Sequence, residues 1–537
     1  MRSESGSAKT KADPAQSART RSRSPAYSPT AYRGLATSAV IASSASVAMM
    51  VAVAALGRSA AVPRFPSAWP WPPWSARGYY APASLVAVAL WAALLLGAAG
   101  LAAGLVAARR GWRPRPGCLI ACSVVAVLAL TVTPPVGSTD MLDYVIYGRI
   151  TELGHSPYQM TPLQLKATGD PVGAVAPRPW DKDPSVYGPL ATATEWAAAE
   201  LAGASAARTV FWLKVWNALA YLALVLGLDR LLRSDPSRRV RAHLLWSVNP
   251  LMLFAAIAGG HIDVLSAALA FCAVVALQPG HGTDPPTRRF MLAGLLAGAA
   301  AAIKAPMLLV VGGIGWLARR SPRALAAASI GALAVLVPCY LIAGRAAIAA
   351  VAGRASGSPT VYDPPLMLSR ALSLDLTDPG IDLVAALVAV ILAVIMLRRM
   401  PAGPVRFPLV APALALLLAW MITTPQQRPW YDAAIFPLLA LMPATRLDWI
   451  AVVRAVAAAV AEVPGVTYYP YLHPAWVSAT EGTIALEVSP VVLVGAGLVL
   501  IWLLVSGRWA TDDYKTAESQ APPVSPGQLV PVPPGSG

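Results

Sequence analysis

Long apolar segments alternate along this chain with short clusters of lysine and arginine. Of its 537 residues, 56% are hydrophobic and only 13% are charged, whereas a soluble domain carries about 25% charged residues. An apolar run of about 20 residues is long enough to cross a bilayer as a helix. The basic clusters lie between the runs, as they do at the cytoplasmic ends of membrane helices. These features predict an all-α polytopic integral membrane protein.

The excess of basic residues has the same origin. The formal net charge is +16, but the lysines and arginines follow the ends of the apolar runs, and no nucleic-acid-binding motif accompanies them. We therefore expect the lipid bilayer as a partner and no nucleic acid. The four cysteines all lie inside apolar runs, where small packing residues are a simpler interpretation than a metal site or disulfides: Cys118, Cys122, Cys272 and Cys339.

Composition divides the chain into three parts. Residues 1–33 and 509–537 are expected to be disordered cytoplasmic tails, the first basic and the second rich in proline. Residues 34–508 are expected to form the membrane domain, with 13 or 14 spans by our count of apolar runs. Residues 137–205 form the first large polar loop, which should carry short helices on the membrane surface. The last three expected spans cover about 433–445, 448–463 and 487–506.

Residues 290–318 admit two interpretations, a single long helix or two short helices folded back on each other. Arginine pairs flank both ends of this segment: Arg288, Arg289, Arg319 and Arg320. Because such pairs mark the cytoplasmic side, both ends should face the cytoplasm. Lys304 and Pro306 at the midpoint also indicate a break. We favour the hairpin, although the sequence does not decide between the two.

The large polar loop opens with two acids, Asp140 and Asp143, directly after an apolar run. Acids at a membrane boundary are costly unless they have a function or face water. Aromatic and cationic residues follow closely: Tyr144, Tyr147, Arg149 and Tyr158. Acids suit sugar hydroxyls, a cation suits phosphate, and aromatic rings suit the face of a sugar. We interpret this stretch as the catalytic loop of a membrane enzyme that acts on a sugar phosphate.

With the hairpin, unusual polar and aromatic residues from four other segments reach the same outer side: Tyr187, His261, Asp263, Lys304, Arg428, Trp430 and Tyr431. Simpler explanations exist for several members of the set. Asp140 is placed to cap the helix that starts near Met141, and Arg149 to pair with Glu152 on a surface. The tyrosines and Trp430 suit a lipid–water interface. Convergence of five segments on one side is what favours a site.

We expect no cofactor at this site. His261 and Asp263 are two ligands, which is too few for a closed metal site, and no third ligand is evident. A lipid-phosphate donor carries one phosphate rather than two, so its reaction does not require a cation. A metal ion is therefore possible but not favoured.

Five short motifs follow one another between residues 140 and 431. They are D-x-x-x-Y-x-x-Y-G-R-x-x-x-x-G-x-x-P-Y (140–158), Y-G-P (187–189), N-P-L with G-H-I-D (249–263), I-K-A-P (303–306) and R-P-W-Y (428–431). The ordered set resembles the membrane-embedded GT-C glycosyltransferases that use polyprenyl-phosphate sugars. More narrowly, it is similar to the actinobacterial polyprenol-phosphate-mannose-dependent α-1,6-mannosyltransferases. The resemblance implies a GT-C-like bundle with an acid in the first large outer loop as general base, and Asp140 occupies that position.

The resemblance also implies a reaction. Mannose would move from polyprenyl-phosphate mannose to an α-mannan or lipoglycan acceptor, with inversion and an α-1,6 linkage, on the outer face of the plasma membrane. Candidates to stabilise the phosphate are Arg149, Lys304 and Arg428. Asp143 or Asp263 would hold sugar hydroxyls, and Trp430 or Tyr431 would stack on the ring.

The chain departs from the family pattern at two places. Asp143 stands where family members often have a small polar or aromatic residue, and H-I-D stands where the family has H-N-D. The choice between Asp140 and Asp143 as base therefore stays open, as do the donor sugar, the acceptor, the lipid length and the oligomeric state.

Two alternatives remain, one from another function class and one within the enzyme class. The first is a transporter or flippase of a lipid-linked sugar, for which paired repeats with broken helices are expected; one break, at Lys304, is evident. The second is a GT-C arabinosyl- or glucosyltransferase, because no residue distinguishes the sugar.

Overall fold

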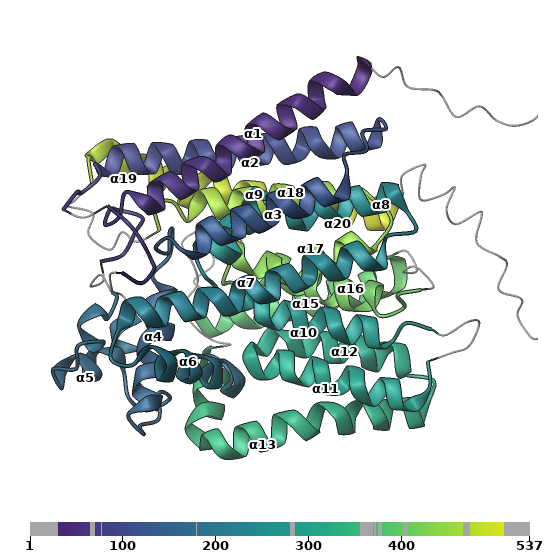
Figure 1. Cartoon of the computed structure of the whole chain (residues 1–537). Coiled ribbons are helices and arrows are strands. Elements are labelled where there is room, and N and C mark those ends of the chain that lie inside the picture. The colour runs from purple at the N-terminus through teal and green to yellow at the C-terminus, as the bar shows by residue number, and fades with distance from the viewer. Residues whose placement is uncertain are drawn as a thin grey trace, which may run out of the picture.

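The computed structural model describes residues 30–64, 70–76, 78–178, 180–279, 285–354, 369, 372–373, 378–400, 406–465 and 473–509. These residues form helices and connecting loops with no β-strand among them (Figure 1). The expected tails, 1–33 and 509–537, lie almost entirely outside the described residues.

Six helical segments of the described chain are long and apolar enough to cross a bilayer. They are α1 (Thr30–Ala55), α2 (Ala83–Arg109), α7 (Ala206–Leu231), the run through α8 (Pro236–Ala242) and α9 (Pro250–Met252) to residue 258, α13 (Pro322–Arg354), and α19 (Ala475–Thr483) continued by α20 (Ser489–Ser506). Shorter apolar helices accompany them, namely α3 (Pro116–Thr131), α10 (Asp263–Ala276), α12 (Leu308–Ala318) and α16 (Val410–Thr423). The prediction of an all-α polytopic membrane protein is confirmed, whereas the count of 13 or 14 spans stays a prediction.

One expected span is wrong. Residues 433–445 contain the end of a short 3₁₀ helix (Pro429–Ala434) and α17 (Phe436–Leu441), a helix of 6 residues, whereas the next expected span corresponds to α18 (Leu447–Ala461). The side chains of α17 are all buried in the protein core. The segment is apolar because it faces other helices rather than lipid, and apolar composition alone does not distinguish these two environments.

The hairpin interpretation of residues 290–318 is confirmed. Helix α11 (Thr287–Ile303) ends at Lys304, whose backbone is extended (φ −141°, ψ 117°), and α12 follows after a short turn. Gly294 packs against Ala328 of α13 and Gly298 against Ala332. These contacts advance together along both helices, so α11 and α13 run parallel. Helix α12 must therefore bring the chain back between them.

The two ends of the bundle differ chemically. At one end, α4 (Asp140–Glu152), α5 (Pro162–Ala167) and α6 (Pro189–Ala202) form a cap of short helices, at the left of Figure 1. The polar loop was expected to carry such helices. At the other end, arginines join the loops: Arg113 donates to Ser237 Oγ (3.0 Å), and Arg406 donates to the Leu231 carbonyl (3.0 Å). Helices α12 and α15 (Asp378–Arg399) also end in arginine pairs there.

Two glycines bring the cap close to the rest of the structure. A Cβ atom at Gly148 would collide with the backbone of Glu195, so α4 and α6 pack in close contact only with glycine there. Gly188 lies against the Ala302 carbonyl, and its N–H donates to the Ile303 carbonyl (3.0 Å). Gly188 therefore joins the cap to the end of α11, directly before Lys304.

Candidate active site

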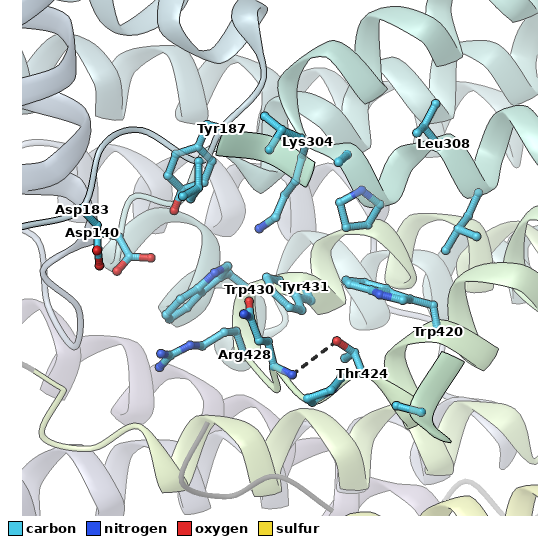
Figure 2. Close-up of a pocket in the computed structure, with 18 of the residues that line it drawn as sticks. Asp140, Asp183, Tyr187, Lys304, Leu308, Trp420, Thr424, Arg428, Trp430 and Tyr431 are labelled. Carbon is cyan, nitrogen blue, oxygen red and sulfur yellow. Dashed lines mark hydrogen bonds between the residues drawn. The ribbon is translucent and has the colours of Figure 1, made fainter. Parts of the chain in front are cut away.

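A cavity of about 470 Å³ lies beneath the cap, between segments that are far apart in sequence. Its polar lining includes Asp140, Asp143, Asp183, Tyr187, Lys304, Arg428, Trp430 and Tyr431. Its apolar lining includes Leu308 and Leu309 of α12, Ala385 and Ala389 of α15, and Trp420 of α16. Figure 2 shows the acids on one side of the cavity, with Leu308 and Trp420 on the opposite side.

The acids are presented by the first turn of α4. Asp140 is the first residue of this helix, and its N–H donates to Ser138 Oγ (3.1 Å). Asp143, Tyr144 and Tyr147 follow at spacings of three, four and seven residues, so all share one helix face with Asp140. Asp140, Asp143 and Tyr147 line the cavity.

The two acids differ in environment. Burial raises the pKa of Asp140, while the nearby charges of Arg428 and Lys304 oppose this rise. Burial raises the pKa of Asp143 well above its ordinary value, and the negative charge of Asp140 raises it further. Asp143 Oδ1 is buried without a hydrogen-bond partner within the described residues. Asp140 is therefore the acid that ionises first.

A stacked pair of rings lies beside Asp140. The rings of His261 and Trp430 are nearly parallel, at 10°, with centroids 3.5 Å apart. His261 Nδ1 is 3.6 Å from Asp140 Oδ2, which is too long for a hydrogen bond. Burial, followed by the charges of Lys304 and Arg428, holds the pKa of His261 well below its ordinary value. The imidazole is thus neutral and buried, and it supports the Trp430 ring that lines the cavity.

Each cation of the cavity is held by an acid behind it. Lys304 is paired with Asp263, and its Nζ is 4.1 Å from the centroid of the Tyr431 ring. Arg428 donates to both carboxylate oxygens of Glu462, at 2.8 and 2.9 Å. These ion pairs fix the two cations at the edge of one cavity, across from Asp140.

A tyrosine pair forms the wall next to Lys304. Tyr187 lines the cavity, and its ring meets that of Tyr144 edge to face, with centroids 5.0 Å apart. Tyr144 is buried, and its hydroxyl donates to the Tyr187 hydroxyl (3.2 Å). Tyr144 thus orients Tyr187 rather than reaching the cavity itself.

Residues 41–320, just over half of the chain, match the profile of a family described as alpha-(1->6)-mannopyranosyltransferase, N-terminal domain. The chain belongs to this family. The matched range contains Asp140, His261 and Lys304, whereas the segment with Arg428 and Trp430 lies beyond it.

Two curated relatives are similar to parts of this chain. Alpha-(1->6)-mannopyranosyltransferase B of Corynebacterium glutamicum is 25% identical over 204 residues, which cover 36% of this chain and 33% of the relative. Alpha-(1->6)-mannopyranosyltransferase Rv1459c of Mycobacterium tuberculosis is 26% identical over 139 residues, which cover 26% and 24%. The matched region therefore spans a third or less of each relative's length. No solved structure matches the chain.

Two of the twelve predicted site residues do not join the others. Arg149 donates to Asp170 (2.8 and 2.9 Å) and is paired with Glu152 (3.0 Å). Tyr158 is buried, with its hydroxyl 2.8 Å from Thr192 Oγ1. Neither lines the cavity. The remaining ten line it or contact residues that do.

Some residues of the site were not predicted from the sequence. Asp183 and Trp420 line the cavity, and Glu462 holds Arg428. Asp183 lies in the W-D-K-D-P stretch between two motifs, and Glu462 is a lone acid at the end of an apolar run, so both gave a weak signal. Trp420 carried no signal in the sequence, because tryptophan is common near the end of a span, at the membrane interface. Within the described residues, no group of three or more His, Cys, Asp or Glu side chains is arranged to hold a metal ion.

Proposed function

We propose that this protein is a membrane glycosyltransferase that moves mannose from polyprenyl-phosphate mannose to an α-mannan or lipoglycan acceptor, with an α-1,6 linkage. One observation carries the proposal. A single cavity holds Asp140 across from Lys304 and Arg428, with aromatic rings between them, and its lining becomes apolar toward α12 and α15. A base, a phosphate site, a sugar platform and an apolar wall for a lipid chain are the parts that this reaction needs.

Asp140 acts as the general base in this proposal. The acceptor hydroxyl oxygen attacks the anomeric carbon of the donor as its proton passes to the Asp140 carboxylate. The bond between the anomeric carbon and the phosphate oxygen breaks, and its electron pair leaves with the phosphate. Attack from the side opposite the phosphate converts a β-linked donor into an α-mannoside. Asp140 suits this role better than Asp143 because it ionises first.

The leaving phosphate gains negative charge in the transition state, and fixed cations stabilise it without further reorganisation. Lys304 and Arg428 are such cations, since their acid partners hold them in place. Trp430, supported by His261, offers a flat surface for the sugar ring. Burial raises the pKa of Asp143 well above its ordinary value, which favours the protonated form that donates a hydrogen bond to a sugar hydroxyl.

The chemical difference between the two ends supports an orientation. Arginine clusters gather at the end of the bundle away from the cavity, and such clusters mark the cytoplasmic side. The cavity then faces the outer side of the plasma membrane, where a lipid-linked donor presents its sugar.

The proposal is tested with the purified protein in proteoliposomes containing polyprenyl-phosphate [³H]mannose and a short α-1,6-mannoside acceptor. We expect a labelled, α-linked, longer mannoside. Parallel reactions with polyprenyl-phosphate arabinose and glucose test the sugar. Absence of any elongated product, with labelled lipid reaching the opposite leaflet, would show a flippase instead.

A further inference from the structure

A second cavity lies at the basic end of the bundle, between α18 and α20. Its volume is about 950 Å³. Helix α18 runs from this cavity at Arg446 to the candidate active site at Glu462. Its 15 residues at about 1.5 Å each make the helix about 22 Å long, and the two cavities share no lining residue. The second cavity is therefore a separate site.

The second cavity is a groove, and positive charge dominates its outer part. Arg109, Arg446 and Arg508 line it. The acid beside them, Asp448, already receives two hydrogen bonds from Arg241, and it is 3.7 Å from Arg109. Within the described part of the chain, no ion pair involves Arg446 or Arg508. Three arginines and no acid are among the described residues that line the groove, so it has an excess of positive charge.

Tryptophans hold two of these arginines at the groove. The guanidinium of Arg109 lies 5.4 Å from the Trp449 ring centroid, and that of Arg508 lies 5.5 Å from the Trp502 ring centroid. Such pairs are typical of the membrane interface, where the ring contacts lipid and the cation reaches the headgroup level.

The inner part of the groove is apolar and follows α18 and α20 away from the arginines. Val453, Val492, Ala496 and Val499 line it. Gly495 also lines it, and no atom lies within 4 Å of the position that a Cβ would take there. The groove therefore combines a cationic mouth with an open apolar channel, which is the shape of a phosphate headgroup joined to an acyl chain.

We propose that this groove binds an anionic phospholipid of the leaflet at the basic end, with its phosphate at Arg109, Arg446 and Arg508 and an acyl chain along Gly495. A soluble phosphate would leave the apolar channel unused. The charge excess selects an anionic headgroup over a zwitterionic one, because each arginine near an anionic lipid contributes about a fivefold gain in affinity.

The test measures lipid binding rather than activity. Full-length protein, delipidated in a neutral detergent, is titrated with cardiolipin, phosphatidylglycerol or phosphatidylcholine, and bound lipid is counted by native mass spectrometry. We expect the two anionic lipids to bind and phosphatidylcholine not to. The Arg446→Gln/Arg508→Gln double variant should bind about 30-fold more weakly. The Arg320→Gln/Arg399→Gln double variant removes the same charge at the same end and should bind as wild type.

Three outcomes would overturn the proposal. One is equal binding of phosphatidylcholine, and a second is equal loss in both double variants. The third concerns Asp512 and Asp513, which follow Arg508 closely in sequence. If lipid binds only after both are changed to Asn, the chain's own tail occupies the groove.

The apolar channel has its own control. Gly495→Leu extends from a Cβ position with no atom within 4 Å into the channel and should weaken binding, whereas Gly482→Leu, whose Cβ position is also open, should not. Competition by glycerol phosphate as strong as that by lipid would favour a soluble ligand and overturn the lipid assignment.

Discussion

Asp140 and Asp143 share one face of α4, but the pKa of Asp143 is raised further than that of Asp140, and this difference makes Asp140 the better general base. A general base must be ionised, so transfer should fall as the pH drops through the raised pKa of Asp140. Lys304 lowers this pKa. Lys304→Met should therefore shift the acidic limb of kcat/KM to higher pH, in addition to lowering the maximum rate. A pH profile of transfer measures the shift, and an unmoved limb would contradict the role of Asp140 as base.

Arg149 and Tyr158 make contacts that predict structural roles. Tyr158→Phe removes a buried hydrogen bond to Thr192 and should lower the free energy of unfolding by about 1 kcal/mol. Because Tyr158 does not line the cavity, kcat/KM should stay within about twofold of wild type. Thermal unfolding and transfer assays measure the two effects. A large loss of kcat/KM at unchanged stability would place Tyr158 in the substrate site.

At the residue scale, the sequence identified which residues are unusual but not which of them meet. Helix geometry would have excluded Arg149, since nine residues at 100° each place it on the face opposite Asp140. Nothing comparable relates Arg428 to Glu462, because that contact depends on how two distant helices pack.

The turn between α11 and α12 positions Lys304, and Gly188 of the cap lies against it. Gly188→Ala would put a methyl group into the Ala302 carbonyl and displace the turn. A displacement of about 1 Å at a reacting site costs about 100-fold in rate, so we expect a loss of that order. Gly315→Ala in α12 has room for its methyl group and should keep full activity. Equal activity of the two variants would show that the turn is not critical.

At the element scale, charge was the informative signal and apolarity the ambiguous one. The arginine pairs around residues 290–318 predicted the hairpin correctly, because both pairs favour the cytoplasmic side of the membrane and so place both ends of the segment there. The apolar run at 433–445 predicted a span wrongly, because α17 is buried among other helices.

The whole molecule places its cap and its arginine clusters at opposite ends, which predicts a fixed orientation. In a background without the four cysteines, a cysteine at Leu163 of the exposed α5 should react with a membrane-impermeant maleimide in intact cells. A cysteine at Arg320 should react only after the membrane is permeabilised. The reverse pattern would put the cavity on the cytoplasmic side.

The central claim is that Asp140 is the base of a mannosyl transfer, and single-turnover transfer by Asp140→Asn and Asp143→Asn at equal folded protein tests it most directly. We expect Asp140→Asn to lose about 10²–10⁴-fold in rate. Asn closely resembles a protonated Asp in shape, so Asp143→Asn should stay within about tenfold of wild type. Near-full transfer by Asp140→Asn, with the loss confined to Asp143→Asn, would contradict the account.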